Sequence, residues 1–330
     1  MPYWENVTRS FRIAWNYKYL WLIALFSGEA GGAGSNYNFS QGASPRGNNS
    51  SISSQQVSDA ATSVSNWLSS HAGLVAFLVA VWLVIVVAFF ILGAICEGAT
   101  VRAAAEHDAE RPFNLGWAWR SGLNTMWVVV RFRLILFVLY LPILVVVIGL
   151  SVSIFAAFTG NSVAGGFIGL FAILSLFSIL YAIYLYLLDR LGSRAIILEQ
   201  LMARAGLVRA HRLLIKRLGR TLLVWLLSIA VAFVVGLLLG CFLALVFVPV
   251  VILGVVLYTA SSGAVLALAI VAGLILFAIS LVIQSFFGAQ SATYWTLAFR
   301  RLDLDYAPAP GYQFQPPPVP PAPPAGPAPS

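Results

Sequence analysis

Charged residues are scarce in this chain, and their scarcity excludes an ordinary soluble protein. Only 9% of its 330 residues are Asp, Glu, Lys or Arg, whereas 60% are hydrophobic. A soluble domain carries about 25% charged residues and could not bury this much apolar surface. The composition therefore indicates a membrane protein before any motif is considered.

Residues that bind metals or form disulfides are also few. The three histidines, His71, His107 and His211, lie in separate segments without metal-ligand spacing, and His107 is interpreted as part of a solvated helix face. The two cysteines, Cys96 and Cys241, are predicted on opposite sides of a membrane, so we expect no disulfide framework. The sequence also has no Gly-rich phosphate loop. It therefore predicts no metal and no cofactor.

Five apolar runs contain no charged residue and no histidine. About 20 apolar residues are needed to cross about 30 Å of hydrocarbon, and a helix satisfies its own backbone hydrogen bonds there. The sequence therefore predicts spanning helices over residues 74–95, 134–158, 163–188, 221–240 and 263–287.

A sixth candidate span covers residues 19–34. Its apolar part, Tyr19–Phe26, rises only about 12 Å as a helix, so the small residues that follow would have to complete the crossing. If it crosses, every basic residue except Arg46 falls on the cytoplasmic side, as the positive-inside rule predicts. The charges favour six spans with both termini in the cytoplasm. A half-inserted elbow is the alternative.

The fifth run continues apolar to Tyr258, which is too long for one span. We interpret residues 221–240 as the span and the rest as an outer segment broken at Pro249. A seventh span over residues 241–258 is the alternative. All but two basic residues are arginine, which is typical of GC-rich bacterial genomes. We therefore expect a multi-pass protein of a bacterial cytoplasmic membrane.

The chain also repeats a unit of an amphipathic cytoplasmic helix followed by a membrane hairpin. The returning spans end at Gly98, Gly192 and Gly288, at nearly equal intervals. The predicted fold is thus an all-α polytopic transmembrane bundle of about six spans, with amphipathic elbow helices at the interface and a three-fold hairpin repeat. The alternative is that membrane hairpins resemble one another by composition alone.

Two groups of residues are candidates for binding. A helix with a basic face and an apolar face lies in the headgroup plane, and anionic lipid is the partner expected for Arg209, Arg212, Lys216 and Arg220. Alternatively, these charges only set the orientation of the spans in the membrane. A polar cavity is the hypothesis for Ser175, Ser178, Tyr184 and Gln284, with helix packing as the alternative. The net charge of +8 lies between apolar runs, so we expect no nucleic acid as a partner.

Catalytic candidates are weak. A membrane enzyme would need catalytic polar residues that converge at a membrane edge, and the candidates are Glu97, Arg102 and Asp189. Of these, Glu97 and Asp189 fit charges at helix ends better than a catalytic group. We therefore expect no enzyme. The first hypothesis is a scaffold or accessory protein that binds lipid, a protein partner or a second copy of the chain. The alternative is a small-solute or lipid transporter, which the repeat motivates.

Three loose motifs suggest a family resemblance: residues 194–199 (RAIILE), residues 205–210 (AGLVRA) and residues 294–301 (YWTLAFRR). With the elbow-and-hairpin pattern, they resemble uncharacterised bacterial membrane proteins similar to the membrane domain of some glycerophosphoryl diester phosphodiesterases. The resemblance covers roughly residues 1–305 and implies a membrane-domain fold. It implies no activity, because the catalytic domain of those enzymes has no counterpart here.

The chain divides into an integral membrane domain, residues 1–305, and a proline-rich tail, residues 306–330. Residues 28–56 within the first part are rich in Gly, Ser and Asn and are predicted to form an outer loop. The tail is expected to be extended, disordered and cytoplasmic. It either binds a partner or is passive.

Overall fold

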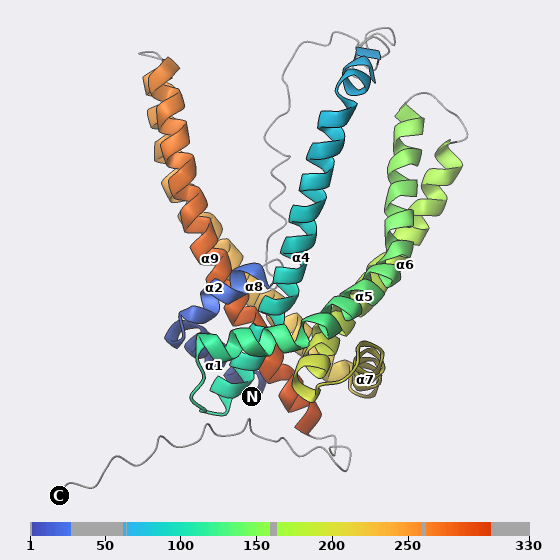
Figure 1. Cartoon of the computed structure of the whole chain (residues 1–330), viewed down its shortest axis with the longest axis vertical. Coiled ribbons are helices and arrows are strands. Elements are labelled where there is room, and N and C mark those ends of the chain that lie inside the picture. Colours follow the sequence, from blue (N-terminus) through green and yellow to red (C-terminus); the bar gives the residue numbers. More distant parts are fainter. Residues whose placement is uncertain (1, 28–61, 64, 159–163, 259–261, 305–330) are drawn as a thin grey trace, which may run out of the picture.

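The computed structural model of the chain describes residues 2–27, 62–63, 65–158, 164–258 and 262–304. Every regular element in these ranges is a helix (Figure 1). The elements are α1 (Pro2–Asn16), α2 (Tyr19–Phe26), α4 (Ala72–Asp108), α5 (Leu115–Phe158), α6 (Ala164–Glu199), α7 (Ala203–Lys216), α8 (Leu218–Tyr258) and α9 (Ser262–Leu304). The prediction of an all-α polytopic membrane protein is confirmed.

Five helices, α4, α5, α6, α8 and α9, are long and apolar enough to cross a membrane. They coincide with the five predicted runs. The shortest of these elements, α6, has 36 residues and rises about 54 Å, well beyond the roughly 30 Å of hydrocarbon. Each of these helices is therefore long enough to cross the bilayer with several turns to spare.

The long helices pack together at one end and separate at the other (Figure 1). We call the packed end the base; it holds α1, α2, α7 and the parts of the long helices that lie against them. The parts that extend away form three arms: α4 alone, α5 with α6, and α8 with α9 (Figure 1). Phe132, Leu185 and Trp295 are buried in the base. By contrast, at most 6% of the most apolar 18 residues in each spanning helix are buried within the chain.

The predicted sixth span is not present among the described residues. The apolar part of segment 19–34 forms α2, whose eight residues rise only about 12 Å, and residues 28–34 lie outside the described ranges. Its side chains Leu20, Ile23 and Ala24 are buried in the base, where α2 packs against α4 and α9. The described part of this segment therefore matches the elbow alternative.

The predicted break at Pro249 is wrong. Helix α8 continues from Leu218 to Tyr258 with Pro249 inside it, as α5 continues through Pro142. Proline removes one backbone hydrogen bond, but membrane helices tolerate this when the freed groups are satisfied locally. Because no turn interrupts α8, residues 241–258 form no separate seventh span.

The repeat-related glycines lie where helices cross closely. A Cβ atom on Gly98 would lie 2.4 Å from Thr125 Oγ1 of α5, and one on Gly192 would lie 2.5 Å from the Phe132 ring of α5. Small residues at these points allow α4 and α6 to approach α5. The three arms follow the order of the three predicted units, and α2 and α4 are the described parts of the first one. Residues 28–56, with Arg46, and the tail 306–330 lie outside the described residues.

Candidate functional site

The predicted basic stripe on α7 divides into one structural residue and an exposed group. Arg209 donates hydrogen bonds to Glu199 at the end of α6, with 3.3 Å between Nη2 and Oε1, and to Asp303 Oδ1 of α9 at 2.8 Å. This arginine thus ties three helices of the base together. Arg212, Lys216 and Arg220 are exposed.

A hollow of about 450 Å³ lies between the end of α7 and the start of α8. It is lined by Lys216, Arg217, Leu218, Gly219 and Arg220, so three of its five residues are basic and none is acidic. Closely spaced positive charges at an interface attract anionic headgroups. Of the residues predicted to contact lipid, this arrangement therefore favours those at the junction between α7 and α8.

The four residues predicted for a polar cavity do not come together. Ser175 donates to the carbonyl of Ala172, and Ser178 donates to that of Leu174, both within α6. The Tyr184 hydroxyl lies 2.7 Å from Nδ1 of His211 on α7, while Gln284 lies half-buried on α9. The two serine hydroxyls are satisfied by their own helix, which is the packing role that was the alternative.

An open groove runs between the α5–α6 arm and α8, with a volume of about 1010 Å³. Its walls are mostly aliphatic and aromatic, and its residues are Tyr140, Ile179, Ala182, Ile183, Tyr186, Trp225, Ser228, Ile229, Ala232, Phe233, Gly236 and Leu237. None of the four predicted cavity residues lines it. The groove depends on how two hairpins are spaced, which the sequence does not indicate.

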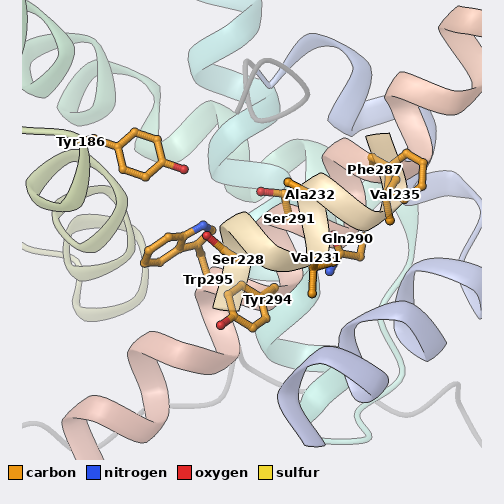
Figure 2. Close-up of a pocket in the computed structure, with 10 residues that line it drawn as sticks. All are labelled: Tyr186, Ser228, Val231, Ala232, Val235, Phe287, Gln290, Ser291, Tyr294 and Trp295. Atoms are coloured by element: carbon orange, nitrogen blue, oxygen red, sulfur yellow. The ribbon is translucent and has the colours of Figure 1, made fainter. Parts of the chain in front are cut away.

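A smaller polar pocket adjoins this groove and shares Tyr186, Ser228 and Ala232 with it. Figure 2 shows Tyr186 of α6 on one side, facing residues of α8 and α9 that include Ser228, Gln290 and Ser291. Gln290 Nε2 donates to Ser10 Oγ of α1 at 3.1 Å. The pocket therefore joins the groove to the packed base through hydrogen-bonding side chains.

Glu97 and Asp189 belong to a buried group of charges in the base. Arg133 Nη2 of α5 lies 2.6 Å from Glu97 Oε2 of α4 and also donates to the carbonyl of Ser27 at 3.1 Å. Asp189 of α6 interacts electrostatically with Arg133, and the adjacent Arg190 is buried. Sequence reasoning treated these arginines as topological charges. The structure shows that Arg133 also ties α5 to α4.

Arg102, the third catalytic candidate, lies apart in a pair with its own helix. Its Nε is 3.2 Å from Glu106 Oε1, four residues further along α4. Pairs with this spacing stabilise an isolated helix by a few tenths of a kcal/mol. The ion pair between Arg102 and Glu106 therefore stabilises α4.

The interpretation of His107 as solvated is wrong. Its side chain is only 5% exposed, because the Tyr17 ring stacks on it with 3.5 Å between ring centroids. Its Nε2 shares a short hydrogen bond with the Tyr19 hydroxyl. The charged neighbours of His107 in sequence suggested solvent, but the elbow formed by α1 and α2 covers it.

The comparisons with known proteins give a family and no activity. The family of unknown function DUF7544 matches residues 6–298, which is most of the chain. No curated protein and no solved structure matches. The resemblance to the phosphodiesterase membrane domain therefore stays a prediction.

Proposed function

We propose that this chain, which belongs to the DUF7544 family, is a non-catalytic membrane scaffold or accessory protein that binds lipid. Its family supplies no activity. The observation that carries the proposal is the separation of the arms: at most 6% of the most apolar 18 residues in each spanning helix are buried within the chain. In a bilayer, other apolar groups must fill the space between the arms.

Lipid chains fit this space better than a partner's helices. Exposed residues of the α4 arm include Phe77, Leu78, Trp82 and Phe89, which are large. Membrane helices that pack against each other usually present small residues at the contact. The side chains of this arm therefore favour contact with acyl chains over a second copy or a partner helix.

The headgroup contact that we propose lies at the α7–α8 junction. Arg212, Lys216 and Arg220 are exposed there, and each basic residue near an anionic surface contributes about 1 kcal/mol. Removing two of them should therefore weaken binding of anionic lipid by roughly thirtyfold. Arg209 is not expected to contribute, because it pairs with Glu199 and Asp303.

The transporter alternative has less support. It calls for a cavity bordered by Ser175, Ser178, Tyr184 or Gln284, and none of these residues lines the groove or the smaller pocket beside it. The groove beside α8 is lined by residues of α5, α6 and α8 and by none of these four.

The test measures thermal unfolding of the purified full chain in detergent with added phosphatidylcholine or phosphatidylglycerol. A ligand that binds the folded state raises the unfolding temperature by mass action. We expect both lipids to raise it, and phosphatidylglycerol to raise it more. Lys216→Ala with Arg220→Ala should strongly reduce the extra increment from phosphatidylglycerol and keep the increment that both lipids share.

Arg209→Ala is the matched control on the same helix. It should lower the unfolding temperature without lipid and leave the extra increment from phosphatidylglycerol intact. If neither lipid changes the unfolding temperature, the proposal of lipid binding is contradicted. Reproducible catalytic turnover, or solute uptake into proteoliposomes, would contradict the scaffold.

A further inference from the structure

We infer that the groove between the α5–α6 arm and α8 is a specific site for one phospholipid of the leaflet at the base. The inference rests on the proposed function and adds the site and the class of ligand. The acyl chain would lie along the apolar walls, and the glycerol and ester groups would lie at the polar end of the groove.

The groove is polar at its base end and apolar at its far end, which is the arrangement that a phospholipid of that leaflet requires. Helices α6 and α8 run antiparallel, so Tyr186 and Ser228 lie at the base end of the groove, while Ile179 and Leu237 lie at the far end. The polar pocket with Gln290 and Ser291 opens at the same base end (Figure 2). A molecule with one polar end and one apolar end fits this arrangement in one orientation.

The length of the groove matches one leaflet. From Trp225 to Leu237 helix α8 rises about 18 Å, and from Tyr186 to Ile179 helix α6 rises about 10 Å. The hydrocarbon layer of one leaflet is about 15 Å thick, half of the bilayer core. Ser228 lies about 12 Å along α8 from Arg220, so the polar end of the groove lies within reach of the basic junction.

The polar end offers hydrogen-bond donors for ester or phosphate oxygens. Tyr186 shares a side-chain hydrogen bond with Trp295, and tryptophan can only donate. The tyrosine hydroxyl accepts that bond and can also donate one, so we assign Tyr186 the role of donor to a lipid bound in the groove that it lines. The Arg190 guanidinium carbon lies 5.1 Å from the centre of the Tyr186 ring and adds positive charge at the same level. Uncharged donors beside an arginine fit the glycerol-phosphate region of a lipid.

Two glycines provide a matched pair of variants. Gly236 lines the groove, and Gly273 lies on α9 outside it; a Cβ atom at either position would meet nothing within 4 Å. Gly236→Trp should fill the groove without disturbing the helices, while Gly273→Trp adds the same side chain to a lipid-facing surface. Both replacements also remove a helix glycine, so their effects on helix stability cancel in the comparison.

The experiment reconstitutes the full chain in nanodiscs with phosphatidylglycerol that carries a diazirine on one acyl chain, and it maps the cross-linked peptides after irradiation. Cross-links to residues 179–186 and 228–237 should dominate in the native chain. They should fall at least fivefold in Gly236→Trp and stay unchanged in Gly273→Trp. Tyr186→Phe, which removes only the hydroxyl, should lower them by a smaller factor of about five or less, as expected for about 1 kcal/mol.

The outcomes separate the site from the general function. If both tryptophan variants retain the native pattern, the groove is not the site, although lipid binding elsewhere would stand. If cross-links spread evenly over all three arms, the groove has no preference and the inference is wrong. If Gly236→Trp unfolds, Tyr186→Phe carries the test: fewer cross-links in the groove support the site, and an unchanged pattern overturns it.

Discussion

Leucines of α6 lie in two different surroundings within one helix. Leu185 and Leu188 are buried at the base, with Leu188 only 2% exposed, whereas Leu176 in the arm is 64% exposed. Burying a large apolar side chain from water contributes about 1.5–3 kcal/mol. Within a bilayer the alternative surroundings are lipid tails, which are as apolar as leucine, so that driving force is absent between arms. The comparison teaches that the base holds this fold together and the bilayer surrounds the arms.

The same division applies to polar contacts. The base contains the ion pairs between helices, including Arg133 with Glu97, Arg209 with Asp303 and Arg9 with Asp108. The arms contain hydroxyls that donate within their own helix, such as Ser151 to Val147 and Ser280 to Phe277. Contacts that join different helices therefore concentrate at the base, and substitutions there should have the largest effects.

The largest effect is expected for Glu97→Gln. It leaves the Arg133 guanidinium without the buried carboxylate of Glu97, and removing one partner of a buried pair costs about 3–5 kcal/mol. Because Arg133 is partly exposed, we expect the lower end of this range. The free energy of unfolding, measured by denaturant titration in a fixed detergent, checks it.

Glu5→Gln is the control for that variant. Glu5 pairs with Arg301 at 3.1 Å, but the Glu5 side chain is 65% exposed, so the pair should contribute less than about 1 kcal/mol. Equal losses in the two variants would show that burial of the Glu97 pair does not matter. The expected difference between buried and exposed ion pairs of the base would then be absent.

An intermediate effect is expected for Gly122→Ala. A Cβ atom there would lie 2.3 Å from the carbonyl oxygen of Ile95 on α4, and a backbone atom cannot rotate away. Overpacking of this kind costs about 1–3 kcal/mol. Gly273→Ala in the α9 arm meets open space and should be neutral or stabilising, because alanine favours helix over glycine by about 1 kcal/mol. Opposite signs in the same unfolding assay would support the comparison, and two equal losses would contradict it.

The arms were predictable from sequence, while the base was predictable only in outline. Uncharged runs such as residues 263–287 must be helical in hydrocarbon, so composition alone identifies them. From the sequence, Arg133 could either orient its span in the membrane or form an ion pair. Which of these it does depends on Glu97, which lies 36 residues earlier on another helix. His107 was misjudged for the same reason, since α1 and α2 cover it.

The candidate site shows a similar limit. The basic residues of α7 could be recognised, but the sequence did not separate Arg209 from Arg212, because the carboxylates of Glu199 and Asp303 approach only in the folded base. The groove beside α8 has no local signal either. It arises from the distance between two hairpins, which apolar periodicity does not encode.

The smallest effect is expected for Leu176→Ala. Its side chain faces outward from α6, so truncation removes contacts with lipid rather than with the protein, and the folded chain should lose less than about 0.5 kcal/mol. Leu188→Ala, the same change three turns nearer the base, should cost about 2–5 kcal/mol by leaving a cavity. Both are measured by denaturant titration in one detergent. A large loss for Leu176→Ala would mean that the arms pack against each other in the folded protein, and the groove between them would then be closed to lipid.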